Sequence, residues 1–177
     1  MTAQATWCRI DGASSNAAHP SPTIGLAANG VGVLDPSSSL IAHRAELGSG
    51  TIVYSGVIVS SDQDSTVRLG ERCVLYPGCV LEAGNGGLIL IGDEVELGPG
   101  GVTIRAIGSG DMTTLEDQVR VNGNCDSPVR VSWVEAVLKG AGIADRVTLA
   151  QGEVRSCRAS FNEATTERQS SYHPPAN

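Results

Sequence analysis

The sequence predicts an all-β fold, a single-stranded left-handed parallel β-helix, and three observations lead to this prediction. A large aliphatic residue returns every six residues through the middle of the chain, as in LGERCV (69–74) and LYPGCV (75–80). The fifth residue of each such hexad is small or β-branched, except Glu153 in LAQGEV (149–154). The chain also has 22 glycines but only three Tyr, two Trp and one Phe among 177 residues. This composition suits short strands and tight turns better than a core filled with aromatic rings.

Each hexad is expected to form one short strand and one turn, so that three hexads make a coil with three flat sides. The first and fifth residues point inward, and only small or β-branched side chains fit the fifth place, close to a corner. A lone amphipathic strand would alternate with a period of two and a helix with 3.6, so neither explains a period of six. The hexads are IAHRAE (41–46), LGSGTI (47–52), VYSGVI (53–58), LGERCV (69–74), LYPGCV (75–80), IGDEVE (91–96), LGPGGV (97–102), LEDQVR (115–120), VNGNCD (121–126), VLKGAG (137–142), IADRVT (143–148) and LAQGEV (149–154).

The spacing between coils is longer than three hexads. Leu47, Leu69 and Ile91 start equivalent hexads 22 residues apart, which leaves four additional residues in each coil. We expect these residues to bulge at one corner, so that three loops form a row along one edge. A 22-residue coil is also compatible with a right-handed β-helix, but the hexad order favours the left-handed form. The loops are expected within residues 60–68, 82–90 and 105–114.

The two ends of the chain lack the hexad pattern. Residues 1–30 are rich in Ala, Ser and Pro and predict an irregular N-terminal cap, which would cover the open strand edges of the helix. Residues 31–155 form the predicted β-helix. Residues 156–177 form a C-terminal tail, with a short helix expected around 159–169.

Charge and cysteine content restrict the partners and the compartment. The net charge is −7 and no Lys/Arg cluster occurs, which argues against a nucleic-acid partner. No basic segment precedes an apolar run near the start, and no apolar run reaches 18 residues, so neither a signal peptide nor a membrane span is expected. Five cysteines without CxxC spacing favour a reduced, cytoplasmic setting over a thiol-rich zinc site.

The hexads LGERCV, LYPGCV, IGDEVE and IADRVT resemble the hexapeptide-repeat (isoleucine-patch) superfamily, whose fold is the left-handed parallel β-helix. The resemblance covers residues 37–155. It implies a homotrimer, often with the active site between subunits. It also implies one of several activities, because acyltransferases, γ-class carbonic anhydrases and non-enzymatic assembly proteins share this fold.

Acyltransferases of this superfamily use a histidine as general base, which deprotonates the acceptor so that it attacks a thioester. His43 is the histidine within the hexads and is therefore the candidate catalytic residue. Its third place in IAHRAE points outward, either into a cleft between subunits or into solvent. The γ-carbonic anhydrases need three histidine ligands for zinc, whereas the hexads supply one, so no metal site is predicted.

Other reactive side chains have structural interpretations. Cys73, Cys79 and Cys125 hold the inward fifth place, which favours a role in the core over a nucleophilic one. Acidic residues near the turns could act as an acid–base pair, bind a cation or solvate the surface. They are Asp62, Asp64, Glu82, Asp93, Glu94 and Glu96. Four arginines are candidates for binding phosphate or carboxylate, namely Arg68, Arg72, Arg105 and Arg120.

Two functional hypotheses follow. The first is an acyltransferase-like enzyme that moves an acyl group from CoA or a carrier thioester to a small-molecule acceptor, with acyl-CoA as a co-substrate and no permanently bound cofactor. The second is a non-catalytic β-helix that binds a protein partner in an assembly. The enzyme hypothesis requires a cleft that contains His43 and an arginine, whereas the assembly hypothesis requires an exposed apolar patch.

Overall fold

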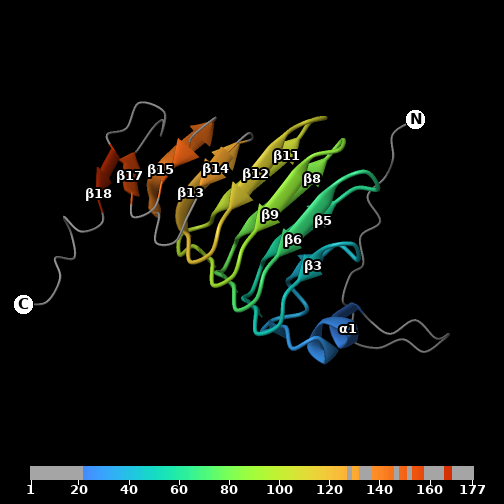
Figure 1. Cartoon of the computed structure of the whole chain (residues 1–177). Helices are drawn as coiled ribbons and strands as arrows, with labels where there is room; N and C mark the ends of the chain where they lie inside the picture. The colour runs from blue at the N-terminus through green and yellow to red at the C-terminus, as the bar shows by residue number, and fades with distance from the viewer. Residues whose placement is uncertain are drawn as a thin grey trace, which may run out of the picture.

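The computed structural model describes residues 22–126, 129–131, 137–145, 148–150, 153–157 and 166–168. These residues form a parallel β-solenoid, whose coils stack side by side along one axis (Figure 1). Within the described part of the chain there is one helix, α1 (Pro22–Ala28), which contacts the first coil. The all-β parallel solenoid predicted from the hexads is therefore confirmed. The left hand of the coil stays a prediction.

The first four coils each contain three short strands, separated by turns. They comprise β1 (Gly32–Val33), β2 (Leu40–Ile41) and β3 (Glu46–Leu47); β4 (Ile52–Val53), β5 (Ile58–Ser61) and β6 (Thr66–Leu69); β7 (Val74–Leu75), β8 (Val80–Gly84) and β9 (Leu88–Ile91); and β10 (Glu96–Leu97), β11 (Thr103–Ile107) and β12 (Met112–Leu115).

Equivalent strands of successive coils pair in parallel and build three faces. Face A contains β1, β4, β7 and β10, face B contains β2, β5, β8 and β11, and face C contains β3, β6, β9 and β12. The chain then continues in longer strands. These are β13 (Arg120–Asp126), β14 (Val129–Val131), β15 (Val137–Asp145), β16 (Thr148–Leu149), β17 (Glu153–Cys157) and β18 (Thr166–Arg168).

Strand β13 joins two faces into one. Its first residues pair with β10 on face A, at Glu96 and Arg120, and its last residues pair with β11 on face B, at Ile104 and Cys125. Strand β15 continues both pairings, while β14 and β16 extend face C. The later coils therefore have two strands instead of three.

The core is a stack of aliphatic side chains from equivalent positions. On face C, the register places Leu47, Leu69, Ile91 and Leu115 in successive coils, and each of them is buried. The first three are 22 residues apart, as the hexads predicted. Because the side chain of each coil rests on that of the next, removing one aliphatic group would leave a cavity between two coils.

The fifth hexad place also points inward, with one shift. Thr51, Cys73 and Val95 are fully buried, with 1% or less of their surface exposed. In LGPGGV, however, Gly101 is exposed and Val102 takes the inward place. The prediction was wrong by one residue here, because this coil carries one more residue at the turn between faces A and B.

The four additional residues of each coil do not bulge as loops, so that prediction was also wrong. They lengthen the strands on either side of one corner instead, as the adjoining arms β5–β6, β8–β9 and β11–β12 show (Figure 1). Val67, Ala83 and Ile89 alternate with outward residues and are buried within these arms. Burial of alternate side chains favours continued strands, which leaves only short turns at the tips.

The two ends of the chain contain regular structure, namely helix α1 near the start and strand β18 near the end. The N-terminal cap predicted for residues 1–30 includes helix α1, in which Leu26 packs against the core. In the tail, strand β18 pairs antiparallel with β17 at the end of the segment for which a helix was expected. Residues 1–21 and 158–165 lie outside the described residues.

Candidate functional site

The turn between faces C and A carries most of the acidic side chains near the middle of the solenoid. We call this row of turns the acidic corner, formed by residues 48–50, 70–72, 92–94 and 116–118. It holds one guanidinium, that of Arg72, and five carboxylates, so its formal charge is −4. The carboxylates belong to Glu71, Asp93, Glu94, Glu116 and Asp117.

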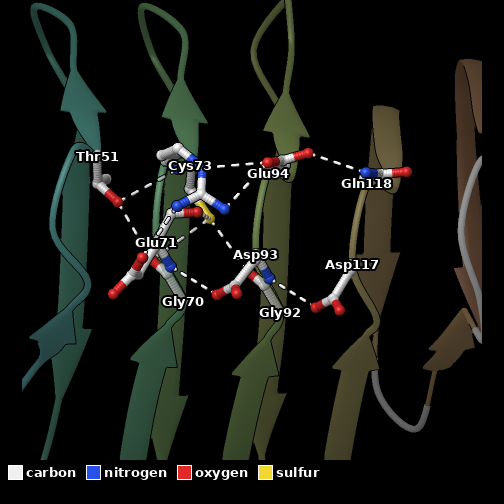
Figure 2. A network of polar contacts seen from close by, with 10 residues as sticks. Thr51, Gly70, Glu71, Cys73, Gly92, Asp93, Glu94, Asp117 and Gln118 are labelled. Atoms are coloured by element: carbon white, nitrogen blue, oxygen red, sulfur yellow. Dashed lines mark hydrogen bonds and ion pairs between the residues drawn. The ribbon is translucent and has the colours of Figure 1, made fainter.

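Two aspartates of the acidic corner hold the backbone of the preceding coil. Asp93 Oδ1 accepts a hydrogen bond of 2.7 Å from the backbone N–H of Glu71 (Figure 2). In the next coil Asp117 Oδ1 accepts one of 2.8 Å from the N–H of Asp93. A Cβ atom at Gly70 would overlap the carboxylate of Asp93, and one at Gly92 would overlap that of Asp117. The glycine of one coil and the aspartate of the next therefore belong together.

Three consecutive coils place a residue with a long side chain in the left-handed backbone region at the acidic corner. The φ angles are 54° at Arg72 and 58° at both Glu94 and Gln118. Non-glycine residues rarely adopt such angles. The side chains join in one row, since Arg72 Nε donates to Glu94 Oε1 at 3.0 Å and Gln118 Nε2 donates to Glu94 Oε2 at 2.9 Å (Figure 2). The hydrogen bond from Gln118 and the nearby guanidinium lower the pKa of Glu94.

This row borders a hollow on face A, which we call the polar hollow. Its volume is 360 Å³, and Val74 contributes to its wall. Arg120 Nη2 lies 3.3 Å from Glu96 Oε1, so two guanidinium–carboxylate pairs face the same space. The hollow is lined by Arg72, Val74, Glu94, Glu96, Gln118, Arg120 and Val137.

Face A becomes apolar toward the N-terminal coils. Five outward residues form what we call the tyrosine patch, namely Leu34, Ile52, Tyr54, Val74 and Tyr76. The rings of Tyr54 and Tyr76 stack with centroids 5.5 Å apart and planes 12° apart. Leu34 is 61% exposed and Ile52 38% exposed, so large aliphatic groups reach solvent here. Because Val74 belongs to both sets, the patch and the polar hollow are continuous.

A second, more open hollow lies on face C, on the other side of the acidic corner. Its volume is 470 Å³, and Arg68, Leu90 and Thr114 line it beside Glu116 and Asp117. Its lining contains a single basic side chain and no aromatic ring. It offers fewer anchoring groups than face A.

His43 lies on an exposed turn between β2 and β3. Its side chain lines neither of the two hollows. The neighbouring Arg44 donates a hydrogen bond of 2.9 Å to the backbone carbonyl of Gln63, so it points toward the next coil. The geometry of this chain does not bring His43 together with the residues of face A.

The arginines proposed for anion binding each pair with a glutamate one coil away. Arg68 meets Glu46 at 2.6 Å, and Arg105 meets Glu82 at 3.0 Å. Arg72 and Arg120 pair with Glu94 and Glu96, as described above for the polar hollow. Sequence reasoning missed these partners, although the spacings of 22 to 24 residues between them match the length of one coil.

Two cysteines occupy the core, as predicted. Cys73 and Cys79 are each 1% exposed. Burial raises the pKa of both thiols, that of Cys79 to about 12. A thiol with such a pKa is almost entirely protonated at neutral pH and is a poor nucleophile. The side chain of Cys125 lies outside the described residues.

Other searches give negative results for the described part of the chain. No three His, Cys, Asp or Glu side chains there are grouped in a way that could hold a metal ion. No helix in this part is both long enough and apolar enough to span a membrane. Comparison of the sequence with protein-family models and with curated proteins gives no match.

Proposed function

We propose that this chain is a non-catalytic β-solenoid that binds a protein partner through face A. The observation that carries this proposal is the continuity of the tyrosine patch with the polar hollow. An exposed apolar patch rimmed by polar groups is typical of a protein-interaction surface. The stacked coils hold the patch on a regular parallel sheet, so its side chains need little rearrangement to bind.

The residue types on face A support binding. Tyrosine and arginine are enriched among the residues that contribute most to binding energy at interfaces. Tyr54 and Tyr76 hold each other in place by stacking, which lowers the entropy lost when a partner covers them. Arg72 and Arg120 lie within the polar hollow, beside the apolar side chain of Val74.

The same residues are poorly suited to acid–base or nucleophilic chemistry. Glu94 has a lowered pKa, so its carboxylate is a weak base at neutral pH. The thiols of Cys73 and Cys79 are buried in the core. Neither hollow is lined by a histidine, a serine or a cysteine. Binding is the role that this set of side chains supports.

Site-specific photo-cross-linking in the native host tests the proposal. A photoreactive phenylalanine analogue replaces Tyr54 in one variant and Ile107 in a control. Ile107 lies on face B and is 39% exposed, which matches the exposure of Ile52. We expect a discrete adduct from position 54, and its loss when Ile52→Ser is added.

The proposal is tested by two properties of the adduct, its mass and its dependence on the labelled position. No adduct from position 54, or equal adducts from positions 54 and 107, would overturn the proposal. Circular dichroism of each variant establishes that the solenoid is intact. An adduct of twice the chain mass would identify a second copy as the partner.

Acyl transfer and the trimer remain predictions that follow from the hexad resemblance. Acyl transfer requires His43 to lie in a cleft that another subunit completes. Calorimetric titration with acetyl-CoA and CoA, for the wild type and for His43→Ala, tests it. Saturable binding, with acyl transfer lost only in the variant, would support the enzyme and contradict the non-catalytic proposal. Sedimentation equilibrium tests the trimer.

A further inference from the structure

The charge around the tyrosine patch is strongly one-sided. The acidic corner adjoins face A, and its formal charge of −4 lies in residues 92–94 and 116–118, in the coils that follow the patch. Within the polar hollow, two arginines are already paired with Glu94 and Glu96. The whole chain has a net charge of −7, which opposes association of two copies through this region.

We infer that the partner presents a basic segment, whose apolar side chains cover the tyrosine patch while its Lys or Arg side chains meet the acidic corner. This inference rests on the proposed function of face A and specifies the chemistry of the partner. The evidence is charge complementarity, since the coils that follow the tyrosine patch along face A carry the net negative charge of the acidic corner, in residues 92–94 and 116–118. A partner of opposite charge also associates faster and more selectively than a neutral one.

The register of face A sets the order of the contacts. Ile52, Val74, Glu96 and Arg120 follow one another along one row, one residue per coil. Coils stack about 4.8 Å apart, so the row spans about 14 Å. An extended segment of four or five residues covers this length at about 3.3 Å per residue. Its apolar end lies on Ile52 and Val74, and its basic end lies near Glu96.

The carboxylates that face the partner can be separated from those that hold the fold. Asp93 and Asp117 accept backbone hydrogen bonds, so their removal would disturb the turns. The carboxylates of Glu94 and Glu96 accept hydrogen bonds only from side chains in the described part of the chain. The double variant Glu94→Gln/Glu96→Gln therefore removes two negative charges from face A with little change of shape.

The experiment measures fluorescence anisotropy with two labelled ten-residue peptides. Both carry leucine and tryptophan in the first half. The second half contains four lysines in one peptide and four glutamates in the other. We expect the lysine peptide to bind the wild type and the glutamate peptide not to bind. We expect Glu94→Gln/Glu96→Gln to weaken binding of the lysine peptide about tenfold at low salt and to reduce its salt dependence.

A matched control removes the same charge elsewhere. Glu46→Gln/Glu82→Gln eliminates two glutamates that form comparable ion pairs with Arg68 and Arg105 on faces C and B. This variant should bind the lysine peptide as the wild type does. An equal loss in both double variants would show attraction by net charge alone and would overturn the inference.

Other outcomes separate the inference from the proposed function. Equal binding of both peptides, or no binding of the lysine peptide at millimolar concentration, would overturn the basic partner. Face-specific cross-linking at position 54 would still support the proposed function in that case. Ile52→Ser should weaken binding of the lysine peptide, and Ile107→Ser should not. If neither has an effect, the peptide binds away from the patch and the inference is wrong.

Discussion

The first four coils and the later coils align residues on face C with different numbers of residues per coil. On face C, Leu47, Leu69, Ile91 and Leu115 stack in successive coils, and each pair is separated by one long coil of sequence. The register of this face continues to Val131 and Leu149, which follow after shorter stretches of chain. The later coils are shorter because they omit the corner between faces A and B and have a shorter connection between faces B and C.

The omitted corner has a local cause. In the second to fourth coils this corner contains glycines with positive φ, namely 68° at Gly56, 74° at Gly78 and 74° at Gly101. In the later coils the corresponding segments lie within continuous strands β13 and β15. The register between these strands shifts between Asn122 and Asn124, which is an irregularity rather than a turn. Coil length is therefore adjustable as long as inward side chains remain aligned between coils.

Substitutions in the core should give the largest difference in stability between the first four coils and the later coils. Leu81 is fully buried between Val59 and Ile104 of the coils on either side, whereas the strand of Leu149 continues face C from one coil, paired at Val131. Leu81→Ala should lower the free energy of unfolding by about 3–5 kcal/mol, and Leu149→Ala by about 2 kcal/mol, because the end coil can relax into the cavity. Urea denaturation of both variants measures this. Equal losses would show that the two regions are equally rigid.

The acidic corner provides the second test. Gly70→Ala places a Cβ atom against the carboxylate of Asp93 and the backbone of Gly92. We expect a loss of about 1–3 kcal/mol in the free energy of unfolding, because the corner must shift. The control is Gly32→Ala, since a Cβ atom there lies 3.9 Å from its nearest neighbour, the carbonyl oxygen of Thr51. A similar loss in both variants would contradict the steric explanation.

Substitution of Gly78, in the corner that the later coils omit, should have a smaller effect on stability. A Cβ atom at Gly78 has no neighbour within 4 Å, so Gly78→Ala strains only the backbone, at φ 74°. The expected loss is about 1 kcal/mol, measured by thermal denaturation. Gly78→Asn should lose less, because asparagine tolerates this region better than alanine. If both variants match the wild type, the positive φ does not determine the corner.

Substitution of Asp62, at the tip between β5 and β6, should have the smallest effect on stability, and this effect depends on pH. Hydrogen bonds from Ser65 and from the backbone N–H of Asn85 lower the pKa of Asp62 below its usual 3.8. The carboxylate therefore stabilises the fold above the unfolded pKa, and this contribution is lost as the pH falls through the folded pKa.

Thermal melts from about pH 5 to about pH 2 measure this contribution. The difference in melting temperature between the wild type and Asp62→Asn should narrow as the pH falls. The control Asp64→Asn changes an exposed carboxylate of the same turn. A constant difference between the wild type and Asp62→Asn would show that the charge of Asp62 does not matter.

Much of the fold could be predicted from local pattern. The six-residue period identified the parallel solenoid, and the inward places of Thr51, Cys73 and Val95 were predicted correctly. Tyr54 and Tyr76 both hold the second place of a hexad, in VYSGVI (53–58) and LYPGCV (75–80), and their rings stack in the structure. The candidate site could not be found in this way, because His43 was selected as a candidate by its residue type alone.

The sequence by itself determined the parallel solenoid, most inward places of the early hexads and the 22-residue spacing of Leu47, Leu69 and Ile91, because these follow from the repeating pattern along the chain. Only the tertiary structure decided which residues meet across coils. The pairing of Arg72 with Glu94, and the continuity of Val74 with both patch and hollow, depend on register. Register in turn depends on how many residues each corner accommodates, as the additional residue near Gly101 and the missing corner at β13 show. An additional residue in a corner changes the sequence spacing between partners from 22 to 23 or 24 residues, which a local pattern does not record.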